Sequence, residues 1–273
     1  MRQLLNKWLK NSQLSKIDIL KQLSFRIFSF KTLTFKQLVF KESCLLCAQN
    51  FAIKCEITHP NIHAVCRPCL AELPWHPRTS CPQCGLSSDG NVCGSCLNSP
   101  PDFDATRAVF LYAYPINAMM QRYKYGNSLN LGDTFGKFLS EKVNVEDCLA
   151  NIDLFIPMPM HPQRLKERGF NQALEIAKVL NKLLTKISKE KLDYKSVTRQ
   201  TLTPPQASLP LKERVKNIKG AFKVNGDFTG KRVAIVDDVM TSGASLNELA
   251  KTLKKAGASH VECWVIARTL PHK

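Results

Sequence analysis

The sequence predicts an α/β fold, a parallel sheet flanked by helices, preceded by a small cysteine-rich module. Three observations support this fold class. Short apolar segments with strand character alternate with helical segments after residue 101, a pattern typical of a parallel sheet. Eight of the eleven cysteines form four Cys-x-x-Cys pairs ahead of that region. A length of 273 residues accommodates one domain of ordinary size and one accessory unit.

Changes in composition divide the chain into three parts. We expect a basic extension over residues 1–43, the cysteine module over 44–101 and the α/β domain over 102–273. Within the extension, residues 16–40 repeat every five positions, a period that fits neither a helix nor a strand. This basic, aromatic segment could bind a membrane surface or a nucleic acid. A mobile leader, or a start codon assigned too far upstream, is the simpler interpretation.

Periodicity and turn residues locate the elements of the α/β domain. We expect strands over residues 105–114, 153–158, 221–224, 232–236 and 260–267. Helices are expected over 119–125, after Pro115, over 170–184, and over 244–256, where Gly257 closes the helix. Residues 191–198 fit neither period. Residues 159–169 and 199–219 are expected to be loops, and a loop as long as the second is often functional.

Charge and hydropathy limit the partners and the compartment. Lys and Arg total 39 against 22 Asp and Glu, a formal net charge of +17, which favours polyanionic partners. No stretch approaches the roughly 18 uninterrupted apolar residues of a membrane span, so we expect no transmembrane segment. Because no secretory signal precedes the cysteines, their pairs favour metal binding in a reducing compartment over disulfides.

The paired cysteines predict two structural zinc ions. Two thiolates three positions apart can bind one ion, and two such pairs complete the four-sulfur shell that structural zinc prefers. The first set is Cys44, Cys47, Cys66 and Cys69, and the second set is Cys81, Cys84, Cys93 and Cys96. A closed shell leaves no position for substrate, so the module is a scaffold or a docking surface. We expect the remaining cysteines and the nearby histidines to be packing or surface residues: Cys55, Cys148, Cys263, His59, His63 and His76.

Residues 233–245 predict a pocket for a ribose 5-phosphate. Four apolar residues form a buried strand, and the chain then turns into a helix whose N-terminal N–H groups favour an anion. Asp237 and Asp238 follow the strand and can accept hydrogen bonds from sugar hydroxyls. The residues expected to form the 5′-phosphate loop are Val239, Met240, Thr241, Ser242, Gly243, Ala244 and Ser245. A helix cap alone would not need two adjacent acids and three hydroxyls.

A second group of residues predicts a pyrophosphate site. Arg164 and Arg168 lie four positions apart after a strand, and guanidinium groups bind phosphate oxygens in bidentate fashion. Met160 and His161 precede them and complete the predicted site. Other basic residues could contact DNA or form a lid that excludes water from the pocket. These are Lys124, Arg199, Lys212, Arg214 and Lys216.

The segment 233–245 resembles the phosphoribosyl pyrophosphate signature of type I phosphoribosyltransferases. The order of motifs over residues 44–269 resembles the ComF family of competence proteins, which joins a double zinc ribbon to a phosphoribosyltransferase-like domain. Besides the cysteine pairs and the acidic loop, the matching motifs are Lys124-Tyr-Gly126, residues 157–161, residues 164–172, residues 203–206 and residues 214–217.

The resemblance implies a cytoplasmic bacterial protein of natural transformation or of the use of imported DNA. It implies binding of phosphoribosyl pyrophosphate or a nucleotide, with Mg²⁺ accompanying the pyrophosphate. It also implies binding of single-stranded DNA and work with a helicase-like partner. Two alternatives stay open. One is an active phosphoribosyltransferase of nucleotide salvage, in which Asp237 and Asp238 are catalytic and stabilise positive charge on the ribose. The other is a nucleotide-sensing zinc-ribbon regulator that binds duplex DNA.

Overall fold

The computed structural model describes residues 39–54, 64–126, 128–145, 151–184, 191–202 and 217–271. Several predictions fall outside these ranges: those for residues 1–38, for the motif at 203–206, and for Cys55, His59, His63, Cys148, Lys212, Arg214 and Lys216. The three domain boundaries stay predictions. Within the described ranges, no helix combines the length and the apolar character that crossing a bilayer requires.

The described residues form strands and helices along the whole of their length. They are β1 (Val39–Ser43), β2 (Asn50–Lys54), α3 (Arg67–Ala71), α4 (Gly94–Asn98), β3 (Ala105–Leu111), α5 (Ile116–Tyr125), α6 (Asn130–Val145), β4 (Leu154–Pro157), α7 (Pro162–Arg168), α8 (Gln172–Leu184), β5 (Val197–Arg199), β6 (Phe222–Val224), β7 (Arg232–Met240), α10 (Ala244–Lys255) and β8 (His260–Arg268).

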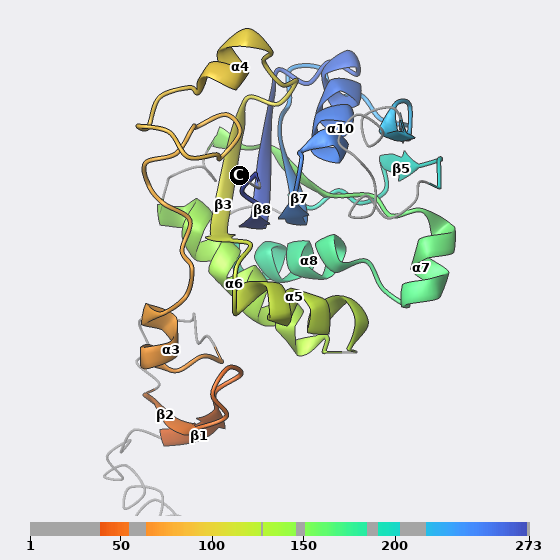
Figure 1. Ribbon diagram of the computed structural model, residues 1–273. Helices are drawn as coiled ribbons and strands as arrows, with labels where there is room; N and C mark the ends of the chain where they lie inside the picture. The colour runs from red at the N-terminus through yellow and green to blue at the C-terminus, as the bar shows by residue number, and fades with distance from the viewer. Residues whose placement is uncertain are drawn as a thin grey trace, which may run out of the picture. The chain divides into compact units, whose positions relative to one another are not determined.

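A four-stranded parallel sheet forms the centre of the α/β region (Figure 1). Its strand order is β3-β8-β7-β4, and each neighbouring pair is parallel. Ile235 of β7 is in register with Cys263 of β8 and with Ile156 of β4. The predicted parallel sheet flanked by helices is therefore confirmed. Two smaller sheets pair β1 with β2 and, antiparallel, β5 with β6.

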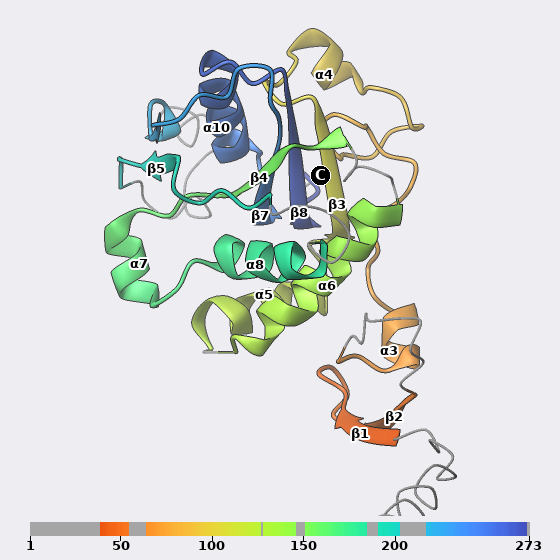
Figure 2. The same cartoon turned by 180° about the vertical axis from the view of Figure 1, so that it is seen from behind.

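Helices cover both faces of this sheet (Figures 1 and 2). Ala234 and Val236 of β7 pack in one core with side chains of α6 and α8, and Val233 and Ile235 pack in another core with α10. A strand buried on both faces has no solvated side, which explains the uninterrupted apolar run over residues 233–236 of β7. The polar residues of the site lie at the carboxyl ends of β4 and β7.

Helix α6 was not expected from the sequence. Phe135, Phe138 and Leu139 are buried at helical spacing, but glycines at 132 and 136 reduce the intrinsic helix propensity of this segment. Gly136 is explained by packing, because a Cβ at this position would lie 2.6 Å from the Cβ of Val179 on α8. A side chain there would push the two helices apart.

Several expected boundaries differ from the structure, and three of them are described here. Residues 159–169, expected to be a loop, contain α7, which begins at Pro162 after the cap residue His161 and ends before Gly169 in the left-handed conformation. Strand β7 continues to Met240 instead of ending at residue 236, because its last residues still pair with β8. Strand β3 ends at Leu111, three residues before the expected boundary.

Candidate functional site

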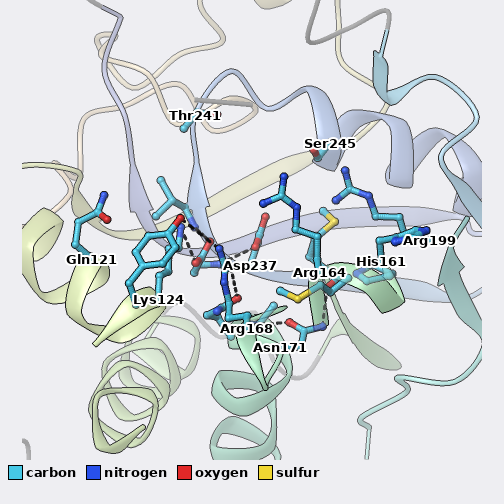
Figure 3. Close-up of a pocket in the computed structure, with 18 of the residues that line it drawn as sticks. Gln121, Lys124, His161, Arg164, Arg168, Asn171, Arg199, Asp237, Thr241 and Ser245 are labelled. Atoms are coloured by element: carbon cyan, nitrogen blue, oxygen red, sulfur yellow. Dashed lines mark hydrogen bonds and ion pairs between the residues drawn. The ribbon is translucent and has the colours of Figure 1, made fainter. Parts of the chain in front are cut away.

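A pocket of about 350 Å³ lies at the carboxyl ends of β4 and β7 (Figure 3). It brings together residues that the sequence analysis assigned to three different groups. The predicted residues that line it are Lys124, Met160, His161, Arg164, Arg168, Arg199, Asp237, Asp238, Val239, Thr241 and Ser245. Figure 3 shows Thr241 and Ser245 along the upper side of the pocket, with Lys124, Arg168 and Asp237 below them. The roles of these residues stay predictions, but their proximity is a property of the fold.

The two adjacent carboxylates differ in their environments. Asp238 is 8% exposed and forms an ion pair with Lys124, whose Nζ lies 2.8 Å from Oδ2. Burial opposes the charge of Lys124, but the Asp238 carboxylate outweighs this effect and raises the pKa of the lysine. Burial and the neighbouring charge of Asp238 raise the pKa of Asp237 to about 8, against the opposing effect of Lys124. Asp237 therefore takes up a proton at a higher pH than an ordinary carboxylate does.

Lys124 had been assigned to a DNA surface or a lid. The structure places its ammonium inside the pocket, where its side chain is 20% exposed and bound to Asp238. Helix α5 positions this residue: Met119, Met120 and Tyr123 are buried against the core, and Lys124 lies one turn after Met120, at the edge of the buried face. The lysine thus belongs to the floor of the pocket.

Three arginines add positive charge to the same pocket. Arg168 is held in place by Gln172, whose Oε1 accepts a hydrogen bond of 2.8 Å from Nη1, and its guanidinium lies over the ring of Tyr125 at 5.2 Å. Arg164 lies one turn earlier on α7, and Arg199 reaches in from β5 (Figure 3). With Lys124, these side chains supply four positive charges against two carboxylates. Such a pocket attracts an anion with more than one phosphate.

The predicted phosphate loop faces two pockets. Val239, Thr241 and Ser245 line the pocket with the two acids. The other loop residues line a second pocket of about 290 Å³, and these are Met240, Ser242, Gly243 and Ala244. Gly243 caps α10 with φ of +80°, and a Cβ there would lie 2.9 Å from Cε of Met240. Glycine is therefore required by both backbone conformation and space.

Several residues of this pocket, called the acidic pocket after Asp237 and Asp238, were not predicted from the sequence. Tyr112 follows β3 and Gln121 lies on α5, and neither position carries a local signal of function. Asn171 has a structural role that could have been predicted from its place before a helix. Its Oδ1 accepts hydrogen bonds from the N–H groups of Ala173 and Leu174, and its Nδ2 donates to the carbonyl of Met158.

The eight predicted zinc ligands form two clusters. In each cluster the four sulfurs lie within 4.8 Å of one another. Sulfur atoms of Cys47 and Cys66 are 3.7 Å apart, as are those of Cys84 and Cys93. A tetrahedral zinc with bonds of about 2.3 Å separates its sulfurs by about 3.8 Å. Both clusters therefore have the ligand set and spacing to hold zinc.

Backbone N–H groups favour the charged thiolate in both clusters. Cys44 Sγ accepts from the N–H groups of Leu46 and Cys66, and Cys81 Sγ accepts from that of Cys93. Burial opposes the thiolate charge, but these backbone hydrogen bonds outweigh it and lower the pKa of Cys44 to about 6 and of Cys81 to about 7. Thiolates are the form that binds metal.

The remaining cysteine and histidine among the described residues pack as expected. Cys263 is fully buried in β8, and His76 is 8% exposed. Nε2 of His76 donates a hydrogen bond of 2.8 Å to the carbonyl of Gly85. His76 therefore attaches the loop between Cys84 and Cys93 to the rest of the protein without being a ligand.

The chain is similar in sequence to several known proteins. Residues 165–271 match the model of the phosphoribosyl transferase domain family. Competence protein F of Haemophilus influenzae is 30% identical over 230 residues, which cover 80% of this chain and 98% of that protein. The DNA utilization protein YhgH of Escherichia coli O6:H1 is 30% identical over 230 residues, or 78% of this chain and 100% of that protein. A purine phosphoribosyltransferase from Pyrococcus horikoshii Ot3 is 19% identical over 57% of this chain and 75% of its own, with a TM-score of 0.28, too low to support an inference.

Proposed function

Because the chain belongs to the ComF family of competence proteins, we propose that it acts in the use of imported DNA and that its acidic pocket binds phosphoribosyl pyrophosphate or a nucleotide. One observation carries the ligand proposal. The Asp237–Asp238 pair, a lysine held by Asp238 and three arginines converge on one pocket beside the N-terminus of α10. A phosphorylated sugar presents the complementary groups, hydroxyls for the acids and phosphates for the cations.

Each part of the ligand has a proposed partner. The 5′-phosphate binds the loop with Thr241 and Ser245, because hydroxyls and the N–H groups of a helix start donate to phosphate oxygens. The ribose hydroxyls donate to Asp237 and Asp238. The pyrophosphate binds Arg164 and Arg168, and Mg²⁺ bound to its oxygens supplies further charge neutralisation. Met160 and His161 line the wall beside it.

A second candidate function uses the same pocket. Tyr112 and Tyr125 line it together with the acids and offer apolar ring surface to a base. In an active phosphoribosyltransferase, the carboxylate of Asp238 would stabilise the positive charge that develops on the ribose as pyrophosphate leaves. A pyrophosphate-release assay with candidate bases, with and without single-stranded DNA, separates turnover from binding. Release that depends on one base would favour the enzyme.

The DNA partner is proposed from the family and from charge. A net charge of +17 supports binding to a polyanion, and counterion release makes such binding depend steeply on salt. We expect preference for a single-stranded over a duplex oligonucleotide, measured by fluorescence anisotropy at several salt concentrations. Sequence-specific duplex binding would instead favour the nucleotide-sensing regulator. A helicase-like partner and a cytoplasmic location follow from the same proposal.

Calorimetry tests the ligand proposal directly. We expect the double variant Asp237→Asn and Asp238→Asn to lose binding of phosphoribosyl pyrophosphate in the presence of Mg²⁺, because amides of the same shape lack the negative charge that holds Lys124 and the sugar hydroxyls. Asp193→Asn is the matched control, since Asp193 lies outside the pocket and accepts local hydrogen bonds from Lys195 and Ser196. Equal affinity of the wild type and the double variant would refute the proposed site.

A further inference from the structure

Arg268 connects the second cysteine cluster to the phosphate loop. This residue ends β8 and is 4% exposed. Its Nε donates a hydrogen bond of 2.8 Å to the carbonyl of Cys84. Its Nη1 donates to the carbonyls of Met240 and Thr241, and to that of Thr269 at 2.9 Å. One buried guanidinium thus bonds a predicted zinc ligand on one side and the start of the phosphate loop on the other.

These bonds fix the orientation of the loop backbone. In a trans peptide the C=O and the following N–H point in opposite directions. With the carbonyls of Met240 and Thr241 held toward Arg268, the N–H groups of Thr241 and Ser242 are directed away from it. The carbonyl of Met240 is held a second time by the N–H of Thr269, at 3.0 Å. Preorganised N–H groups are what a phosphate loop requires, because they bind the anion without rearrangement.

The second cysteine cluster, at the other end of this connection, is also held by hydrogen bonds. The three consecutive carbonyls after Pro82 are each bonded to the body of the protein. Thr106 Oγ1 donates to the carbonyl of Gln83 at 2.6 Å, Arg268 donates to that of Cys84, and His76 donates to that of Gly85 at 2.8 Å. The second cysteine cluster and the sheet therefore share a continuous network of hydrogen bonds. A displacement of Cys84 would therefore be transmitted to Arg268 through the hydrogen bond between the Cys84 carbonyl and Arg268 Nε.

Electrostatics strengthens this connection. A zinc ion with four thiolates carries two positive and four negative charges, a net charge of two negative. Arg268 lines the same small pocket as Cys84 and Cys96. A buried cation is costly without a compensating anion, and carbonyl dipoles compensate it only in part. A zinc ion bound by the four thiolates would supply that anion, and its loss would leave Arg268 uncompensated beside the loop.

We propose that Arg268 is a positioning residue that couples metal binding at the second cysteine cluster to ligand binding at the phosphate loop. The inference rests on the proposed function, because the loop must bind a phosphorylated sugar. The coupling runs in both directions, as any linkage between two binding sites must. Phosphoribosyl pyrophosphate would then slow the loss of zinc from the second cluster, and disruption of Arg268 would weaken ligand binding without removing zinc.

The first test uses Arg268→Lys, which keeps the positive charge but cannot donate to both sides through a planar fork. We expect at least a tenfold loss of affinity for phosphoribosyl pyrophosphate by calorimetry, with two zinc ions per chain still bound. Arg107→Lys is the matched control, because Arg107 pairs with Glu262 on the same sheet at 3.5 Å and lies outside the acidic pocket. Its affinity should equal that of the wild type.

The second test needs no change to Arg268, so it holds even where the lysine variant fails to fold. In the chain with Cys44→Ser and Cys47→Ser, the remaining zinc belongs to the second cluster. Its release to a chromophoric chelator is timed with and without phosphoribosyl pyrophosphate. We expect at least a threefold slower release with the ligand, and no change when Asp237 and Asp238 are both replaced by Asn.

The outcomes separate this inference from the function on which it rests. Absence of binding to the wild type would refute the proposed ligand and the coupling together. Binding to the wild type that Arg268→Lys retains within twofold would refute the coupling alone. Zinc release that is indifferent to a ligand shown to bind would do the same.

Discussion

Replacement of Asp237 by Asn should stabilise the ligand-free protein while impairing its site. The pKa of Asp237 rises from 3.8 to about 8 in the folded protein, because its half-buried carboxyl group is desolvated beside the charge of Asp238. The folded state therefore keeps a proton that the unfolded chain loses, and stability decreases as pH rises from about 4 to about 8. Because Asn cannot ionise, the stability of the Asp237→Asn variant does not show this decrease. Its Oδ1 still accepts the hydrogen bond of 2.8 Å from the N–H of Asp238.

The expected magnitude follows from the same shift. Inside this window, one pH unit changes the free energy of unfolding by about 1.4 kcal/mol. Between pH 6 and pH 8 the advantage of Asp237→Asn should therefore grow by about 2–3 kcal/mol. At roughly 2–4 °C per kcal/mol for a domain of this size, the gap in Tm should widen by about 4–12 °C. Thermal unfolding of both proteins at the two pH values, with zinc present, measures this gap.

Asp193→Asn provides a control of opposite sign. Burial opposes the charge of Asp193, but hydrogen bonds from Ser196 and Lys195 outweigh it and lower its pKa. Asp193 is therefore ionised in the folded and unfolded states throughout this range, and its contribution to stability is lost only at more acidic pH. The variant should be less stable than the wild type by the same amount at pH 6 and pH 8. A gap for Asp237→Asn that stays constant between these values would refute the proposed raised pKa.

Three further predictions concern the ligand, the metal and the loop. Arg164→Ala should weaken phosphoribosyl pyrophosphate binding about 10- to 100-fold in calorimetry, since a hydrogen bond to a charged group contributes about 1.5–3 kcal/mol; unchanged affinity would contradict the assigned pyrophosphate site. Cys81→Ser with Cys84→Ser should lower the metal content from two zinc ions per chain to one, and a content that stays at two would exclude the second site. Gly243→Ala should destabilise the fold by about 1–2 kcal/mol, because of its φ of +80° and the contact with Met240. Thermal unfolding checks the cost, and calorimetry should show weaker ligand binding.

Much of the site could be predicted because its residues carry local signals. The strand at Val233, the two acids, and the glycine at the start of α10 form one continuous segment, and local chemistry alone indicates an anion site there. The arginines of α7 were also predicted from one short segment, in which they lie four positions apart after a strand. Cysteine pairs are likewise local, since their spacing specifies ligands without knowledge of the fold. What these signals have in common is that each lies within one short stretch of sequence.

The residues that were missed depend on contacts between distant segments. Tyr112 and Gln121 enter the pocket only because β3 and α5 pack beside β7, and their types suit many surfaces equally well. Lys124 was recognised as basic, but its pairing with Asp238 joins segments more than a hundred residues apart. Helix α6 was missed because Gly136, which weakens local propensity, serves a contact with Val179 that a single segment cannot reveal.

The position of β8 has a consequence for the synthesis of this protein. The last strand in the sequence lies in the middle of the sheet, between β3 and β7. Until β8 has emerged from the ribosome, β3 and β7 therefore have unpaired edges and exposed apolar side chains. Such edges invite pairing with other chains, and contacts this distant in sequence form slowly. Loss of residues 260–273 alone would leave a polypeptide that contains every acidic-pocket residue and yet has no continuous sheet to hold them.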